Sequence, residues 1–347
     1  MIKLTQAHII GAITAYLLGV FIVPIVIYYS DKKGLVDVPN ERKIHKGKIS
    51  RLGGIAIWLA VMFTFLFLVL LSYYPKGEGL SGIITGGSLM FLLGLIDDIF
   101  CLSAKFKLFL QIVIASIVIL LGVRVDEIYN FFGNNIQLGP VVSYGLSLLW
   151  IVGISNAINF IDGIDGLAGS VVTISSVAIA IISMVVTPSS PISALVAIIL
   201  LGAMLAFLTF NYNPAKIFMG DSGALFAGFM LSTLSITGIM RTGSAMMYLP
   251  FLILAVPIID VAYSSLRRIS KGKSPFVADS EHIHHKLLHH GFSQDLAVLT
   301  LSSLSMVCAI LAIITTGFLN KYYIFAIALA FILFMLNAIS KTIKKGT

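Results

Sequence analysis

The sequence is poor in charge and in cysteine. Charged residues make up 11% of its 347 residues, against about 25% in a typical soluble domain. Hydrophobic residues make up 58%, and the mean hydropathy is +1.02. This balance excludes an ordinary soluble globular protein and predicts a chain that lies in a bilayer. The two cysteines, Cys101 and Cys308, fall in different segments and suggest no disulfide framework; each is more simply a small buried hydrophobe.

Two familiar motifs are also missing. The pattern GxxxxGK[ST] does not occur, so no motif implies ATP. The first apolar run, near residues 8–29, has no small-residue cleavage pattern and is long enough to span a membrane. We therefore expect a retained helix there rather than a removed signal peptide.

Apolar runs of spanning length dominate the chain. A transmembrane helix needs about 20 mostly apolar residues, and eleven runs qualify: 8–29, 52–72, 80–96, 107–123, 140–156, 167–186, 192–210, 222–240, 245–267, 296–317 and 321–341. Two of them, 80–96 and 222–240, are rich in Gly and Ser, which let helices approach closely, so we expect inner helices there. Residues 125–138 predict a short hairpin or interfacial loop. The prediction is one all-α polytopic membrane domain over residues 1–347.

The basic residues indicate the orientation. The expected loops on one side span about 31–51, 97–107, 157–166, 211–221 and 268–295. Of 23 Lys and Arg residues, 18 fall on this side: in these loops, at Arg267 beside the last of them, and in the C-terminal tail. Basic loops stay in the cytoplasm. The N-terminus is then outside, the C-terminus is cytoplasmic, and the positive net charge needs no nucleic-acid partner.

Acidic and polar residues break the apolar runs at four places, all on the basic side. The breaks read GLIDD, NAINFIDGIDG, FMGDSG and SEHIHHKLLHH. Ionisable groups at membrane depth are expensive and usually functional. The outer loops carry only Glu78, Asp126 and Glu127, whereas a transporter should show polar groups along a path between both faces. This asymmetry favours an enzyme with a site on the cytoplasmic face.

Two of the breaks have simpler alternatives. Asp97 and Asp98 suit a general base or a hard cation, but a helix cap followed by snorkelling lysines would also explain them. Asp221 taken alone is an ordinary N-cap. The third break is harder to assign to capping, because its Asn and Asp side chains recur every third residue and a helical turn would bring them towards one face: Asn156, Asn159, Asp162 and Asp165.

The histidine break and the first basic loop each leave two interpretations open. The HIHH run could bind zinc or could clamp a phosphate and a sugar, although the adjacency of His284 and His285 is poor geometry for one zinc ion. The loop 31–51 holds seven basic residues, which either set the orientation and contact anionic lipid or help to hold phosphates.

Five segments in this order resemble the polyprenyl-phosphate N-acetylhexosamine-1-phosphate transferases. They are PNERKIHKGKISRLGG, GLIDD, NAINFIDGIDGLAG, FMGDSG and EHIHHKLL, and they extend from Pro39 to Leu288. The chain is similar to the branch that uses UDP-GlcNAc, because the muramoyl-pentapeptide branch typically carries three consecutive histidines where this chain has HIHH. One departure is Ser50, where many relatives have proline.

The resemblance implies the transfer of GlcNAc-1-phosphate from UDP-GlcNAc to undecaprenyl phosphate, with release of UMP. It also implies a bacterial plasma membrane location and a role in starting an envelope glycan such as a teichoic-acid linkage or an O-antigen. The implied cofactor is Mg²⁺, with Mn²⁺ as a substitute. Two chains could pair through apolar helix faces, although no GxxxG array marks one.

The resemblance also implies roles for individual residues. Asp221 and Asn159 would bind the metal, Asp97 would act as base or position the lipid phosphate, Asp98 would lie beside the metal and phosphates, and Lys107 would pair with the lipid phosphate. The remaining implied residues would bind the nucleotide, the sugar and the diphosphate: Asn156, Asp162, Asp165, Phe218, His282, His284, His285, Lys48 and Arg51. The main alternative to a transferase is a cation or nucleotide-sugar transporter. A non-catalytic membrane scaffold is the third hypothesis.

Overall fold

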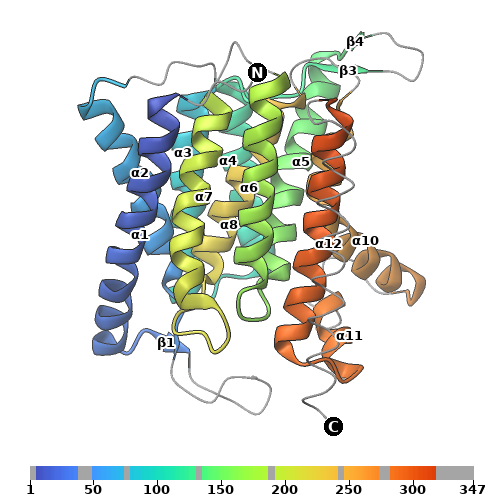
Figure 1. The fold of residues 1–347 in the computed structure, drawn as a ribbon. Helices are drawn as coiled ribbons and strands as arrows, with labels where there is room; N and C mark the ends of the chain where they lie inside the picture. The colour runs from blue at the N-terminus through green and yellow to red at the C-terminus, as the bar shows by residue number, and fades with distance from the viewer. Residues whose placement is uncertain are drawn as a thin grey trace.

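The protein is a bundle of long helices that run alternately up and down (Figure 1). The computed structural model describes residues 5–37, 49–73, 79–129, 135–186, 192–240, 246–272 and 282–317. The helices are α1 (Gln6–Lys33), α2 (Gly53–Leu70), α3 (Leu80–Phe100), α4 (Ala104–Leu120), α5 (Pro140–Ile161), α6 (Leu167–Val186), α7 (Ile192–Asn211), α8 (Gly220–Gly238), α9 (Leu249–Ile253), α10 (Ala255–Ser270), α11 (Ile283–His289) and α12 (Gln294–Thr315).

Within these described residues, seven helices are long and apolar enough to cross a membrane: α1, α2, α3, α5, α6, α7 and α12. The prediction of a mostly helical, multi-pass membrane protein is therefore confirmed. The last predicted span, 321–341, lies outside the described residues, so the count of eleven stays a prediction.

The strands are short and pair as two antiparallel ribbons. In the first, β1 (Val36–Asp37) pairs with β2 (Ile49–Ser50); in the second, β3 (Glu127–Tyr129) pairs with β4 (Asn135–Gln137). The second ribbon confirms the hairpin predicted near residues 125–138. It lies at the opposite end of the bundle from β1 (Figure 1).

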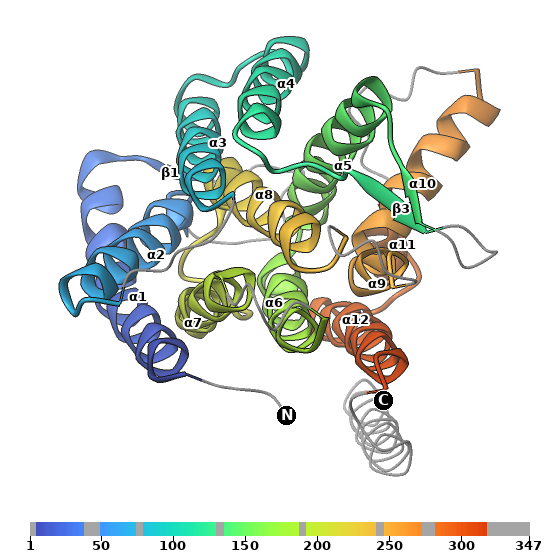
Figure 2. The same ribbon diagram turned by 90° about the horizontal axis from the view of Figure 1, so that it is seen from above.

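Helix α8 lies at the centre of the bundle, between α3, α5, α6 and α7 (Figure 2). Every residue from Ser222 to Gly238 is buried. Glycines permit the close packing: a Cβ on Gly94 would lie 2.4 Å from the Asp221 carbonyl oxygen, and one on Gly54 would lie 2.2 Å from the Gly223 nitrogen. The prediction that the glycine-rich and serine-rich run 222–240 is an inner helix is confirmed.

The prediction of one continuous span over 245–267 is wrong, because this run forms two helices. Helix α9 ends at Ile253, and α10 begins at Ala255 and splays away from the bundle (Figure 1). Pro257 explains the break, because proline has no N–H and its ring clashes with the carbonyl of the residue four positions earlier, here Ile253. The exposed face of α10 is apolar and includes Ile259, Leu266 and Ile269.

Candidate active site

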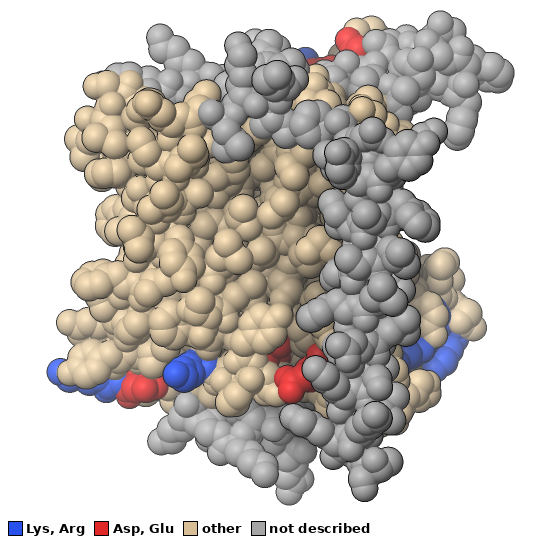
Figure 3. Space-filling model, viewed as in Figure 1, with Lys and Arg blue, Asp and Glu red and all other residues tan. Residues whose placement is uncertain are grey.

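The polar breaks lie at one end of the bundle, where α3, α5 and α7 end and α4, α6 and α8 begin (Figure 1). Acidic and basic side chains gather along this lower edge of the molecule, below a broad apolar belt (Figure 3). Helix α1 begins at the opposite end (Figure 1). The structure therefore brings together segments that are up to about 120 residues apart, as the contact between Asp98 and Asp221 shows.

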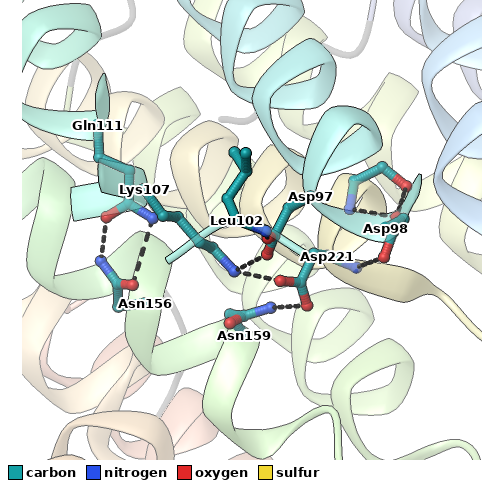
Figure 4. Close-up of polar contacts among 9 residues, drawn as sticks. Asp97, Asp98, Leu102, Lys107, Gln111, Asn156, Asn159 and Asp221 are labelled. Carbon is teal, nitrogen blue, oxygen red and sulfur yellow. Dashed lines mark hydrogen bonds and ion pairs between the residues drawn. The ribbon is translucent and has the colours of Figure 1, made fainter. Parts of the chain in front are cut away.

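Four side chains from four helices form what we call the carboxylate centre: Asp97, Lys107, Asn159 and Asp221 (Figure 4). Lys107 Nζ donates to Asp97 Oδ2 at 2.8 Å and also to Asp221 Oδ2. Asn159 Nδ2 donates to Asp221 Oδ1 at 2.9 Å. Asp221 is 33% exposed and Asp97 only 11%, so Asp221 is the carboxylate that an incoming ligand can reach more easily.

A tight turn between α3 and α4 places Asp97 opposite Lys107. Cys101 ends α3 in a left-handed conformation (φ 52°), and Leu102 N donates to Asp97 Oδ1 at 2.7 Å. Ser103 then caps α4 by accepting from Phe106 N at 3.4 Å. Because Asp97 lies in the last turn of α3 and Lys107 in the first turn of α4, the reversal of the chain brings their side chains together.

Asp98 performs a different task from Asp97. Its Oδ1 accepts from Asp221 N at 2.8 Å, and its Oδ2 accepts from Ser222 N at 3.0 Å and from Ser222 Oγ at 2.7 Å. Asp98 thus caps the N-terminus of α8 from a neighbouring helix, where unpaired N–H groups and the helix dipole favour a carboxylate. The geometry makes Asp98 a support for Asp221.

The end of α5 contributes two of the predicted asparagines in different ways. Asn159 reaches the carboxylate centre, whereas Asn156 Nδ2 donates to Gln111 Oε1 at 2.6 Å and to the Val152 carbonyl at 2.8 Å. Gln111 was not among the residues predicted from the sequence. Its signal was a lone amide inside the apolar run 107–123, a place where a polar side chain needs a partner.

The loop after α5 is hydrogen-bonded to the end of α7 and to the loop before α8. Asp165 Oδ2 accepts from Ala215 N at 3.0 Å, and Gly166 N donates to Asn211 Oδ1 at 3.0 Å. Burial, followed by repulsion from Asp221, Asp98 and Asp165, raises the pKa of Asp162 to about 8. Asp162 therefore holds a proton at neutral pH in the absence of a nearby cation.

The residues His282, His284 and His285, which we call the histidine segment, lie at the start of α11. Asp260 on α10 accepts from His282 Nδ1 at 2.7 Å and from Ile283 N at 2.7 Å. The rings of His282 and His284 are parallel within 3° at 5.9 Å, and His285 lies 4.2 Å from His284, measured between ring centroids. Burial lowers the pKa of His284 to about 3, so this ring is neutral.

The histidine segment touches the end of α5 and the loop that follows it. Phe160 stacks on His282 with 5.5 Å between ring centroids, and a Cβ on Gly163 would lie 2.3 Å from His284 Nε2. That nitrogen is buried and has no hydrogen-bond partner within the described residues. The absence of a side chain at Gly163 therefore makes room for the His284 imidazole.

The first basic loop is joined to the loop before α8 through the backbone. Phe218 N donates to the Ser50 carbonyl at 2.7 Å, and Gly53 N donates to the Phe218 carbonyl at 3.0 Å. Arg51 is exposed between these contacts. The structure thus brings Arg51 and Phe218 to the same loop cluster, while Lys48 lies outside the described residues.

The donors of the carboxylate centre fit a hard cation better than zinc. Within the described residues, no group of three or more His, Cys, Asp or Glu side chains is arranged to hold a metal ion. Mg²⁺ is usually held by one or two carboxylates together with substrate phosphates, so it does not need such a group. Asp221, supported by Asn159, supplies the reachable oxygen donors for a cation of this kind.

These features define a multi-pass membrane protein with an acidic site at one end of its helices. Residues 80–239 match the profile of Glycosyl transferase family 4. A probable undecaprenyl-phosphate N-acetylglucosaminyl 1-phosphate transferase of Bacillus subtilis is 34% identical over 94% of this chain and 89% of its own length. The chain belongs to this family, the polyprenyl-phosphate hexosamine-1-phosphate transferases.

Other relatives carry related names. The decaprenyl-phosphate N-acetylglucosaminephosphotransferase of Mycolicibacterium smegmatis is 30% identical over 86% of this chain and 79% of its own length. The undecaprenyl-phosphate alpha-N-acetylglucosaminyl 1-phosphate transferase of Escherichia coli is 31% identical over 78% of this chain and 74% of its own length. These similarities confirm the family resemblance that the motifs indicated.

Proposed function

We propose that this protein transfers N-acetylglucosamine 1-phosphate from UDP-GlcNAc to undecaprenyl phosphate. The observation that carries the proposal is the carboxylate centre, in which one lysine bridges two carboxylates at the end of a membrane bundle. Family membership and the names of the relatives support the same reaction. We expect this end to face the cytoplasm at a bacterial plasma membrane, because most of the basic residues lie in loops on this side and basic loops stay in the cytoplasm.

In this reaction an oxygen of the lipid phosphate attacks the β-phosphorus of UDP-GlcNAc. A new P–O–P linkage forms, the bond between the β-phosphorus and the bridging oxygen breaks, and UMP leaves with that oxygen. A phosphate monoester has a second pKa of about 6, so it arrives largely ionised at neutral pH. Asp97 therefore orients Lys107 towards the nucleophile and does not need to remove a proton.

Mg²⁺, with Mn²⁺ as a substitute, would be held by Asp221 and Asn159. Bound there, the ion would neutralise charge on the diphosphate. Asp98 keeps Asp221 in place through the N-terminus of α8. Lys107 would transfer its contact from Asp221 to the lipid phosphate.

The remaining residues bind the donor in this proposal. Asp165 reads the uracil edge and Phe218 stacks on the base, with Asp162 supporting the same pocket. The neutral imidazole of His284 and its neighbours His282 and His285 contact the sugar and diphosphate. Arg51 and Lys48 approach the phosphates from the first basic loop.

An apolar groove along α5, α9 and α10 fits the polyprenyl chain. It encloses about 520 Å³ and is lined by Leu149, Trp150 and Gly153 of α5, Phe251 of α9 and Ile258 of α10. Gly153 lies one turn before Ala157, which also lines the groove, and Asn156 lies between them. Other lining residues, among them Ile128 and Met240, lie at the opposite end of the bundle, so a lipid chain in this groove would run along α5 from that end to Ala157, two residues before Asn159.

The decisive experiment mixes the purified protein with UDP-GlcNAc, undecaprenyl phosphate and Mg²⁺ and measures UMP together with the mass of the lipid product. Parallel reactions with decaprenyl phosphate and with UDP-N-acetylgalactosamine identify the preferred lipid and sugar. If folded protein releases no UMP from any combination, while reconstituted vesicles show a flux of Mg²⁺ or UDP-sugar, the protein is a transporter and the proposal is wrong.

The groove has its own test. Gly153 lines the groove, and a Cβ there would meet nothing within 4 Å. We expect the ring of Gly153→Phe to occupy part of the groove and to raise the KM for undecaprenyl phosphate, leaving the KM for UDP-GlcNAc unchanged. Gly145→Phe is the matched control, because Gly145 is also on α5, is equally open and does not line the groove. Equal effects of the two variants would contradict this placement of the lipid.

A further inference from the structure

Gln111 and Asn156 form a reciprocal amide pair between α4 and α5. Asn156 Nδ2 donates to Gln111 Oε1 at 2.6 Å, and Gln111 Nε2 donates to Asn156 Oδ1 at 3.3 Å (Figure 4). The Gln111 side chain is fully buried. Asn156 is half-buried, and it supplies the hydrogen-bond partner that the buried Gln111 amide needs.

The pair lies one turn deeper in the bundle than the carboxylate centre. Gln111 follows Lys107 by four residues on α4, and Asn156 precedes Asn159 by three residues on α5. Side chains three or four residues apart share one face of a helix. The same two helix faces thus meet twice, once through the amide pair and once at Asp221, which both Lys107 and Asn159 contact.

Two features indicate that the pair controls alignment. Two opposed hydrogen bonds fix both the separation of the helices and the rotation of each about its axis, which apolar packing alone leaves freer. A third bond, from Asn156 Nδ2 to the Val152 carbonyl, ties the amide to its own helix. With these bonds made, the Asn156 amide is directed at Gln111 and not at the carboxylate centre.

We propose that Gln111 and Asn156 are positioning residues that set the gap between Lys107 and Asn159 and so align both on Asp221. Neither touches the substrate; Asn156 acts through Gln111. This inference rests on the proposed transferase function. It reassigns Asn156, which the sequence pattern grouped with the substrate-binding residues, and it adds Gln111 to the residues on which turnover depends.

The test uses four variants: Gln111→Met, Asn156→Leu, the double apolar variant, and the exchange Gln111→Asn with Asn156→Gln. The exchange keeps both amides and the same total number of methylene groups. Each single variant should lower kcat roughly tenfold, since a misplacement of about 1 Å can cost about 10²-fold. The KM for UDP-GlcNAc should change less than about twofold, and the exchange should restore kcat to within about threefold of the wild type.

The matched control is Ser116→Ala. Ser116 Oγ lies 2.6 Å from Tyr144 Oη and is another polar contact between α4 and α5, farther along α4 from Lys107. This variant should leave kcat unchanged. If it lowers kcat as much as Gln111→Met does, any weakening of the α4 and α5 contact matters and the specific role of the pair is refuted.

Three other results would overturn the proposal. If Gln111→Met is fully active while every Asn156 variant is inactive, Asn156 contacts substrate directly. If the double apolar variant matches the wild type, the amides are dispensable. If the exchange fails to restore kcat although its thermal unfolding in detergent matches that of the wild type, the pair does not align the site. Absence of UMP release from the wild type would instead refute the proposed function, and the unfolding temperatures would still report whether the pair links the helices.

Discussion

The carboxylate centre and the histidine segment lie at the same end of the bundle but are built in opposite ways. The carboxylate centre draws one side chain from each of four long helices, α3, α4, α5 and α8. The histidine segment lies on α11, a helix of seven residues that is held by Asp260 of α10. The first holds opposite charges in contact, while the second is a stack of rings that includes a neutral imidazole.

The difference indicates which part needs fixed geometry and which needs adaptability. Charged groups aimed at a transition state act strongly only when they are preorganised, and helices in a packed bundle hold them in place. The neutral imidazole of His284 on a short helix can contact a sugar and diphosphate without adding a charge of its own. We therefore expect changes in the carboxylate centre to reduce kcat and changes in the histidine segment to raise KM.

The largest effect is expected from Asp221→Asn. Asp221 accepts hydrogen bonds from Lys107 and Asn159. Loss of its charge should lower the rate of UMP release by about 10²–10³-fold, the range found when a preorganised electrostatic group is removed. The matched control is Asp295→Asn, which changes an exposed carboxylate bonded to Asn213 at 2.8 Å and should keep full activity. Comparable activity of the two variants would remove Asp221 from the reaction.

The second-largest effect is expected from Lys107→Met, which should lower kcat roughly 10²-fold. The methionine leaves Asp97 and Asp221 without their shared ammonium group, so the lipid phosphate loses the lysine that would pair with it. Lys107→Arg keeps the charge and should recover part of kcat. Steady-state kinetics at saturating Mg²⁺ measure this, and equal rates for the two variants would show that charge at this position is unimportant.

Asp98→Asn should lower kcat by about fivefold, since removal of a cap costs about 1 kcal/mol and each 1.36 kcal/mol is a factor of ten in rate. The asparagine NH₂ group would face N–H donors at the start of α8 and displace Asp221. Ser222→Ala removes one of the three bonds and should have a smaller effect. A larger loss in Ser222→Ala than in Asp98→Asn would contradict the capping role.

Asp260→Asn should act mainly on KM. It weakens the hold on His282 and on Ile283 N, so we expect the KM for UDP-GlcNAc to rise by about fivefold with a small change in kcat, as a loss of uniform binding does. Combined with Asp98→Asn, its effect on kcat/KM should multiply, because independent sites add in free energy. Strong non-additivity would show that the two regions work as one unit.

The smallest effect concerns pH and stability. Without metal, the pKa of Asp162 rises from 3.8 to about 8 on folding, chiefly through burial. The folded protein then binds a proton that the unfolded chain has lost, so this stabilisation disappears as pH rises from about 4 through about 8. In EDTA, the melting temperature of Asp162→Asn relative to that of the wild type should increase by a few degrees over this range. A constant difference would refute the raised pKa.

Much of the fold could be predicted because hydrophobic length is a strong signal. The runs that became α1, α5 and α12 were recognisable from composition alone. The break between α9 and α10 was not recognised, because the run 245–267 has the length of one span and Pro257 can either kink a transmembrane helix or end it. Neighbouring structure decides between these outcomes.

The site shows a similar division. The sequence motifs predicted that Asp97, Asp221 and Asn159 belong to one site. In the structure, Lys107 bridges Asp97 and Asp221, and Asn159 donates to Asp221. The capping role of Asp98 could not be predicted, since it depends on the N-terminus of a helix about 120 residues away. Gln111 was missed because a single amide in an apolar run gives no motif, and its partner became clear only when α4 and α5 were placed side by side.

The burial of α8 has a consequence for how the protein is made. Among the described residues, the helix that carries Asp221 is not one of the seven that are long and apolar enough to cross a membrane. Its surface of small and hydroxyl-bearing residues is suited to other helices rather than to lipid. We therefore expect α8 to be retained in the bilayer only when its neighbours are already there, so that membrane insertion and assembly of the site are completed in the same step.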